Sequence, residues 1–172
     1  DRRRKRQISM FTIPHAIFPA PDNFAEYKKK LLKIFDDDTR CKDNVKREIK
    51  TDYFYNNDNI SLPSYCSLVK EALSPYLQQT EKSMGFKLQI KAMWYQQSIK
   101  GQAHGVHNHG PTGFSAVWYV EFDPNEQLAT TFYAPFNDIL TGDLVHCTPK
   151  IKEGDLIIFP SSMLHEQVKN SS

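Results

Sequence analysis

The sequence predicts a mainly β protein, a β-sandwich or squat barrel with helices packed outside it. Two observations carry this prediction. Before residue 86 the apolar residues recur at helical spacing, and after it they alternate with polar residues as they do in strands. Clusters of glycine, proline and asparagine separate the alternating runs, which is typical of antiparallel β domains. A chain of 172 residues is long enough for one domain with a continuous core.

Two helices are expected before the β region, over residues 22–35 and 64–84, because each stretch carries an apolar stripe. Each has a polar residue that can cap its start: Asp22 or Asn23 in the first and Ser64 in the second. Pro75 lies inside the second stretch and is expected to kink it or to begin a new turn. The polar segment 36–59 between the two helices is predicted to be mainly loop.

Five β-rich runs follow the helices, and their lengths and turn boundaries predict strands. These runs are Phe86–Tyr95, Phe114–Phe122, Ala129–Tyr133, Val145–Thr148 and Leu156–Phe159. We therefore assign the whole chain, residues 1–172, to one domain with a helical support region at 10–85 and a β core at 86–172.

The composition excludes several classes of protein. The three cysteines, Cys41, Cys66 and Cys147, are odd in number and widely spaced, which predicts reduced thiols rather than a disulfide framework or a cysteine zinc site. No apolar run approaches the roughly 20 residues of a membrane span, and no apolar stretch of signal-peptide length follows the charged start. We therefore expect a soluble, cytoplasmic protein that has no membrane partner.

The net charge of +2 does not indicate a polyanionic partner. The basic run Arg2–Arg6 could bind nucleic acid or serve as a nuclear address, but a short terminal run of charge is more often solvated. No interleaving of aromatic and basic residues follows it. Nucleic acid is therefore not among the partners that we expect.

Histidines are the candidate metal ligands. His107 and His109 are two residues apart, and on a strand residues i and i+2 project from the same face. Two imidazoles on one face can each offer a neutral nitrogen to a single ion. His165 follows the buried run 156–159 and a Pro-Ser break, which makes it the natural third ligand. Three such ligands leave open positions on the ion for substrate and dioxygen.

Two segments resemble the metal motifs of the 2-oxoglutarate and iron(II)-dependent oxygenases. The first is His107-Asn-His109-Gly-Pro-Thr-Gly-Phe-Ser-Ala-Val-Trp-Tyr119, and the second is Gly154-Asp-Leu-Ile-Ile-Phe-Pro-Ser161 with His165-Glu166 after it. Within that superfamily the chain is similar to a branch common in marine bacteria and phages, with the pattern His-x-His followed by Ser-Gly-Val-Tyr-Tyr. Trp94-Tyr95 and residues 128–135 also fit this branch.

The resemblance implies a double-stranded β-helix, or jelly roll, with flanking helices. It also implies Fe(II), 2-oxoglutarate as cosubstrate, and O2, in a hydroxylase that couples 2-oxoglutarate decarboxylation to oxidation of a C–H bond. The functional analogy is with prolyl-hydroxylase-type enzymes; the substrate, a peptide, a protein or a small molecule, remains open. The location would be the cytoplasm of the host cell if a phage encodes the protein.

His109 departs from the wider superfamily, in which an aspartate or glutamate usually occupies its position. Without that carboxylate the bound ion keeps both positive charges. Either His109 is the third ligand of a three-histidine site, or it turns away and water completes a two-histidine site. We favour the first, because the i, i+2 spacing already places both rings on one face.

The cosubstrate anchor is absent from its usual place. The superfamily holds the distal carboxylate of 2-oxoglutarate with an arginine or lysine some ten residues past the distal histidine, and the sequence ends at Ser172. Residues 1–9 resemble that missing strand, so we hypothesise a circular permutation that places Arg6, or secondarily Arg4, at the anchor position. A solvated basic tail is the alternative. Tyr95 is a second candidate contact for the cosubstrate, although a tyrosine in the barrel wall is an equal alternative.

Two other functions stay open. A three-histidine dioxygenase of the cupin kind would need no 2-oxoglutarate, but no glutamate follows His109 at the place where cupins carry one. A non-enzymatic metal-binding jelly-roll module is the other alternative, and it predicts no turnover.

Overall fold

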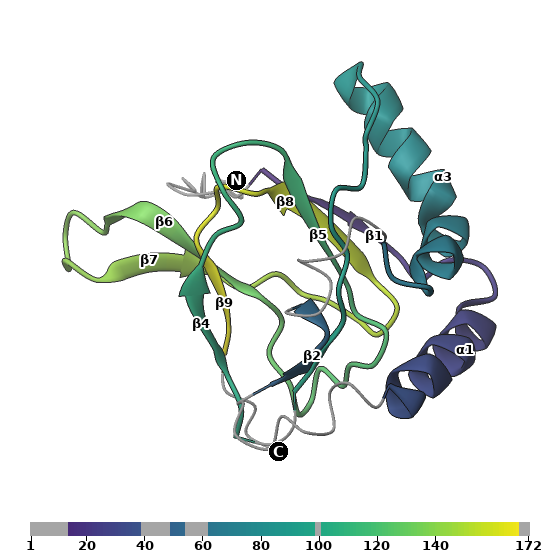
Figure 1. Cartoon of the computed structure of the whole chain (residues 1–172). Helices are drawn as coiled ribbons and strands as arrows, with labels where there is room; N and C mark the ends of the chain where they lie inside the picture. The colour runs from purple at the N-terminus through teal and green to yellow at the C-terminus, as the bar shows by residue number, and fades with distance from the viewer. Residues whose placement is uncertain (1–13, 39–48, 54–61, 99–100, 169–172) are drawn as a thin grey trace, which may run out of the picture.

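The computed structural model describes residues 14–38, 49–53, 62–98 and 101–168 (Figure 1). The helices in this part of the chain are α1 (Phe24–Asp37) and α3 (Cys66–Met84). The strands are β1 (Ala16–Phe18), β2 (Lys50–Thr51), β3 (Gln96–Gln97), β4 (His104–His107), β5 (Phe114–Trp118), β6 (Thr131–Asn137), β7 (Leu144–Cys147), β8 (Leu156–Pro160) and β9 (His165–Gln167).

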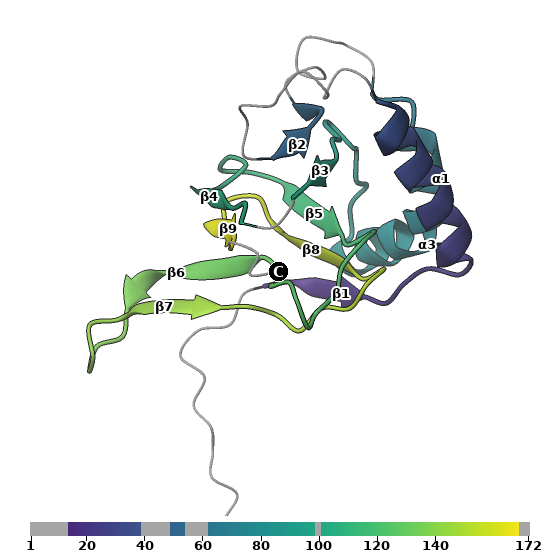
Figure 2. The ribbon, with the colours of Figure 1, turned by 90° about the horizontal axis from the view of Figure 1, so that it is seen from below.

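Two antiparallel sheets form the body of the domain. One has the strand order β1-β8-β5 and the other has the order β4-β9-β6-β7, while β2 and β3 form a separate pair. Figures 1 and 2 show both helices on the side of the β1-β8-β5 sheet, and the β6–β7 hairpin projecting from the opposite side. The prediction of a mainly β fold with flanking helices is confirmed. The chain passes from one sheet to the other between β4, β5 and β6, and again between β7, β8 and β9, as expected for a double-stranded β-helix.

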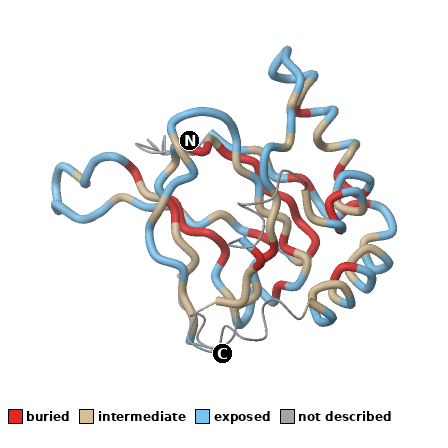
Figure 3. The backbone as a smooth tube through the Cα atoms, in the orientation of Figure 1, coloured by how far each residue is buried: buried red, intermediate tan, exposed pale blue. Residues whose placement is uncertain are grey.

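Strand β8 is the centre of the structure. Leu156, Ile157, Ile158 and Phe159 are all at most 4% exposed, and Figure 3 shows this burial along the strand. Alternate side chains of a strand point to opposite faces. Leu156 and Ile158 pack with α3, whereas Ile157 and Phe159 pack into the space between the sheets. The strand is therefore apolar at every position because both of its faces are covered.

The helices lie where the sequence predicts them but start differently. Asn23 adopts a left-handed conformation before α1 and its side chain caps nothing; α3 begins after Tyr65, also without a side-chain cap. Helix α3 continues through Pro75. Leu31 of α1 is fully buried in a cluster with Tyr65 and Tyr95. Among the described residues, neither helix combines the length and the apolarity that a membrane crossing requires.

The strand predicted over residues 86–95 is wrong. This stretch pairs with no other strand in the described part of the chain, and only Gln96–Gln97 forms a short ladder with β2. The start of the stretch nevertheless lies against β5, because the Phe86 and Phe114 rings stack with centroids 6.2 Å apart. The stretch has the alternating apolar and polar residues of a strand. No described strand forms backbone hydrogen bonds with it.

Strand β6 is longer than predicted. The sequence pattern places its end at Tyr133, whereas the strand runs on to Asn137 through Pro135. Its register with β7 shifts between Tyr133 and Asn137. Proline has no N–H to give to a ladder, so an irregular register at this position accommodates it.

Gly154 is expected to tolerate no side chain. Its φ is +86°, and a Cβ atom there would lie 2.5 Å from the Cβ of Ala20. We expect Gly154→Ala to lower the free energy of unfolding by more than about 2 kcal/mol, because left-handed backbone costs an alanine about 1–2 kcal/mol and the clash adds to this. Urea unfolding measures the change.

Gly142 provides the matched control. Its φ is +76°, and a Cβ atom there would meet nothing within 4 Å. Gly142→Ala should therefore show only the backbone contribution of about 1–2 kcal/mol. Equal losses in the two variants would contradict the role assigned to the close approach of Ala20.

Candidate metal centre

Two of the predicted ligands meet across neighbouring strands. His107 at the end of β4 is the register partner of His165 at the start of β9. Their ring centroids are 4.4 Å apart. His165 is only 4% exposed, and the Phe132 and Phe159 rings lie beside it with centroids 5.9 and 4.9 Å away. The sheet thus holds two imidazoles in contact although 57 residues separate them along the chain.

His109 reaches the same place by a different route from the predicted one. Strand β4 ends at His107, so the two histidines do not share the face of a continuous strand. His109 lies in the turn that follows, where its backbone N–H donates to the carbonyl of Ser161 at 2.9 Å. Its ring centroid is 5.0 Å from that of His107 and 5.0 Å from that of His165. The strand argument was wrong, yet the turn brings the three rings together.

The three histidines form a group with ligand geometry. One nitrogen of each ring can be chosen so that the three atoms all lie within 4.8 Å of one another. A small rotation of these side chains would let one ion contact all three. Within the described part of the chain, this is the group of histidine, cysteine and acidic residues that can hold a metal.

Backbone carbonyls fix the orientation of two of the ligands. The Nδ1 atom of His107 lies 2.7 Å from the Gly105 carbonyl, and that of His165 lies 2.8 Å from the Met163 carbonyl. A carbonyl can only accept, so each Nδ1 carries the proton and donates it. The Nε2 atom of each ring is then left with the lone pair that a metal needs. Metal-binding histidines are commonly oriented in this way.

The electrostatics of the group favour neutral imidazoles. Desolvation by the surrounding protein lowers the pKa of His109 to about 4, and the neighbouring His165, His107 and His104 rings contribute to the shift. Desolvation also lowers the pKa of His165 and of His104. Neutral imidazole is the form that binds a metal, so these shifts extend the pH range in which the site can be occupied.

We expect the metal-free protein to lose stability on acidification. Between pH 6.5, the ordinary pKa of histidine, and pH 4, the unfolded chain binds protons that the folded site does not bind. The free energy of unfolding should therefore fall as the pH drops through this range. Urea unfolding at several pH values measures the slope, and His109→Gln should reduce it. An unchanged slope in that variant would contradict the assignment to His109.

Two further aromatic rings border the triad. His104, the first residue of β4, stacks on His107 with centroids 4.1 Å apart. Trp94 lies against His109 with centroids 5.4 Å apart. The sequence alone favours a loop histidine at His104 and a residue of the core or of a pocket wall at Trp94, because no local spacing relates either one to the ligands.

The structure tests neither of the two predicted contacts with the cosubstrate, Tyr95 and Arg6. The Tyr95 ring is buried and stacks on Phe35 with centroids 4.3 Å apart, and its hydroxyl donates to Asp38 at 3.3 Å. This places Tyr95 among the side chains that pack on α1. Arg6, Arg4 and the segment 1–9 lie outside the described residues. The cosubstrate roles of Tyr95 and Arg6 therefore remain predictions.

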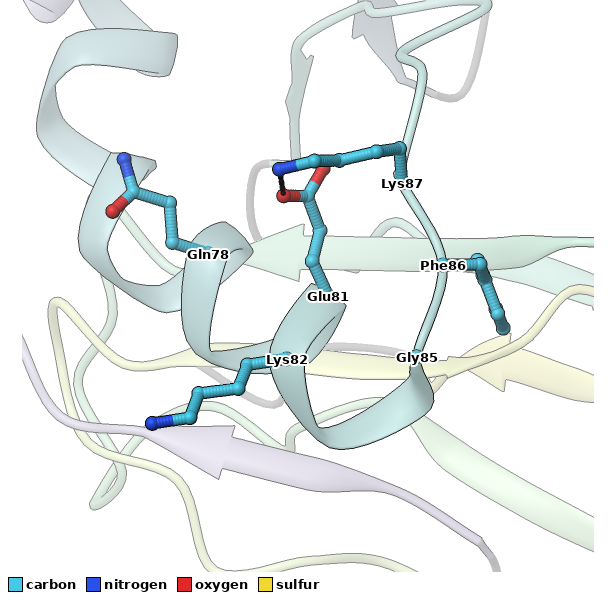
Figure 4. Close-up of a pocket in the computed structure, with 6 residues that line it drawn as sticks. All are labelled: Gln78, Glu81, Lys82, Gly85, Phe86 and Lys87. Carbon is cyan, nitrogen blue, oxygen red and sulfur yellow. Dashed lines mark hydrogen bonds and ion pairs between the residues drawn. The ribbon is translucent and has the colours of Figure 1, made fainter.

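A surface hollow of about 400 Å³ lies at the end of α3 (Figure 4). Its lining is mostly polar, and Lys87 donates to Glu81 across it at 2.9 Å. None of its lining residues belongs to the triad. The hollow is therefore not part of the metal centre.

The chemistry of the donors fits a first-row transition ion. Three neutral imidazoles suit Fe(II), and they suit Zn(II) as well. Three protein ligands on one side of an ion leave its other positions open for small molecules. The residues present are thus able to hold the Fe(II) that the sequence resemblance implies.

Comparisons with known proteins agree with this geometry. Residues 92–172 match a protein family described as "Putative 2OG-Fe(II) oxygenase". The fold is similar to that in the crystal structure of a prolyl-4-hydroxylase from Pseudomonas putida, with a TM-score of 0.57 and 13% identity over 94% of this chain and 88% of that chain. No curated protein matches the sequence. The family match contains all three histidines, and the structural likeness shows the fold.

Proposed function

We propose, from the family match over residues 92–172, that the protein is a 2-oxoglutarate and Fe(II)-dependent dioxygenase that hydroxylates a C–H bond. The observation that carries the proposal is the triad of His107, His109 and His165, whose ligand atoms lie within 4.8 Å of one another. The substrate would be a peptide, a protein or a small molecule that meets the enzyme in the cytoplasm.

The protein residues would have distinct tasks in this reaction. His107 and His165, each oriented by a backbone carbonyl, present Nε2 to the ion. His109 replaces the carboxylate usual in the superfamily. Phe132 and Phe159 exclude water from the buried side of His165. Bound Fe(II), together with 2-oxoglutarate and O2, supplies the oxidising power, and the protein supplies the geometry.

We also propose that residues 1–9 correspond to the permuted last strand of the family and that Arg6, or secondarily Arg4, binds the distal carboxylate of 2-oxoglutarate. The open edge of β5 supports this. In the described part of the chain β5 pairs only with β8. Residues 86–95 lie alongside that edge, because Phe86 stacks on Phe114 and Trp118 packs against the cluster that contains Tyr95.

Arg6→Gln is expected to raise the KM for 2-oxoglutarate by about tenfold or more, with a smaller effect on kcat. The reason is the loss of a charge-assisted, bidentate bond worth about 1.5–3 kcal/mol. Arg3→Gln, which makes the same change of charge in the same segment, is the control and should leave KM unchanged. Arg4→Gln is measured in parallel. A raised KM in Arg4→Gln but not in Arg6→Gln would assign the anchor to Arg4, and an unchanged KM in both variants would contradict the permuted strand.

The test of the main proposal is succinate formation from 2-oxoglutarate with Fe(II) and ascorbate, in the parent protein and in His107→Ala. We expect iron-dependent succinate in the parent and none in the variant. Candidate substrates are added in parallel, because some oxygenases turn over only with their own substrate. Oxygen consumption without succinate would favour the cupin-type dioxygenase, for which the three-histidine donor set speaks. Tight Zn(II) binding without turnover of any kind would favour the binding module.

A further inference from the structure

Trp94 stands beside the one ligand that differs from the usual pattern of the superfamily. Its indole lies 5.4 Å from the His109 ring, with 55° between the ring planes. Tyr53 packs edge-on against the same indole, with centroids 5.1 Å apart. His109 is an exposed residue, whereas His107 is half-buried and His165 is buried. Trp94 therefore lies against the most solvent-accessible of the three ligands.

Among the described contacts, no side-chain hydrogen bond orients the His109 ring. His107 and His165 are each oriented by a hydrogen bond from Nδ1 to a backbone carbonyl. For His109 the described contacts are one backbone bond, to the carbonyl of Ser161, and contacts with rings. The backbone bond fixes the position of the residue but leaves its side-chain torsions free. A flat indole face beside the imidazole restricts those torsions.

The segment that carries Trp94 is itself anchored at several points. The backbone N–H of Tyr95 donates to the buried carboxylate of Asp52 at 2.9 Å. The hydroxyl of Thr51 donates to the Tyr95 carbonyl at 2.7 Å. Strand β3, which begins two residues after Trp94, pairs with β2. The hydroxyl of Tyr65 donates to the other oxygen of Asp52 at 2.6 Å.

This anchoring reaches back to the helical part of the fold. Asp52 is fully buried, and its partner Tyr65 packs in the cluster that includes Leu31 of α1. The backbone beside Trp94 is therefore fixed to the helical layer before any metal binds. A rigid support of this kind is what a residue needs in order to hold a neighbouring ligand in place.

We propose that Trp94 is a positioning residue that holds the His109 imidazole in its metal-binding orientation. This rests on the proposed function for the role of His109 as third ligand. Trp94 would act through His109 alone, since the rings described next to His107 and His165 are others. The loss of Trp94 should therefore weaken the metal site only while His109 is present.

Trp118 offers a matched comparison, since the chain has two tryptophans. Its indole N–H donates to the Gly154 carbonyl at 2.9 Å, and its ring packs with Phe24 of α1. It is therefore a structural tryptophan, of the same size, without a described contact to the triad. Replacement of each tryptophan by phenylalanine leaves one indole as a fluorescent reporter in each variant.

The experiment is a double-mutant cycle with Co(II) as the probe, measured by calorimetry on the metal-free protein. Trp94→Leu is expected to weaken Co(II) binding about tenfold, the size of effect that supporting residues of metal ligands commonly show. In the His109→Ala background the same substitution should have no effect, so the two changes should not add. Trp94→Phe, which keeps an aromatic face, should restore most of the affinity.

Fluorescence gives a second readout. Co(II) should quench the emission of Trp118→Phe, whose remaining indole is Trp94, far more strongly than that of Trp94→Phe. Equal weakening by Trp94→Leu with and without His109 would overturn the proposal, and so would equal quenching in the two phenylalanine variants. Neither readout involves 2-oxoglutarate. A coupled cycle without succinate formation would therefore contradict the proposed activity and leave the role of Trp94 intact.

Discussion

His165→Ala is expected to abolish Fe(II)-dependent turnover and to weaken metal binding more than about a hundredfold. Loss of even an outer partner of a metal ligand costs about 10–100-fold in affinity, and this change removes a ligand itself. His165 is also the buried member of the triad, so its removal leaves a space inside the protein. Anaerobic Fe(II) titration and succinate formation measure the two effects.

His146→Ala is the matched control for this substitution. His146 lies on β7 of the same sheet, is exposed, and stands beside Tyr133 rather than the triad. It should bind Fe(II) and form succinate as the parent does. Urea unfolding of both metal-free variants separates a lost ligand from a lost fold. Retained Fe(II) binding in a folded His165→Ala protein would contradict the metal centre described here.

Phe132→Ala is expected to lower the free energy of unfolding by about 3–5 kcal/mol, the usual cost of removing a buried phenylalanine side chain. Phe132 is fully buried between the sheets and packs edge-on against Phe159, with centroids 4.8 Å apart. Phe136→Ala, on the same strand but 42% exposed, should cost less than about 1 kcal/mol. Similar losses in the two variants would contradict the placement of the core between the sheets.

Phe132→Ala should also disturb the metal centre. The Phe132 ring lies 5.9 Å from that of His165, and the two residues are register partners on β6 and β9. A cavity there lets the buried ligand move, so Fe(II) affinity should fall in the variant even under conditions where it stays folded. Fe(II) titration well below the unfolding midpoint tests this.

The sequence was most informative where a local pattern of residues is enough to predict an element. The run 156–159 is apolar at every position, and it became the strand that is covered on both faces. The helices followed from their apolar stripes to within a few residues. Their starts did not follow, because Asn23 and Tyr65 precede the helices without the side-chain bonds on which capping rules rest.

The strand predicted over 86–95 failed for a physical reason. Alternation records which side chains face the core, but a strand also needs a neighbour for its backbone groups, and pairing is a property of the whole sheet. The position of Trp94 beside His109 was beyond local pattern for the same reason. It depends on Asp52, more than forty residues earlier, which ties down the backbone of the residue that follows Trp94.

The pairing of β4 has a consequence for the order of the whole domain. Among the described strands β4 pairs with β9 alone and so lies at the edge of its sheet, with an irregular register between His104 and His107. An ion bound by His107, His109 and His165 would act as a cross-link between the end of β4 and β9, in addition to their irregular ladder. Occupancy of the centre and attachment of the strand would then be a single equilibrium, and removal of the metal would open the domain at its edge before its core responds.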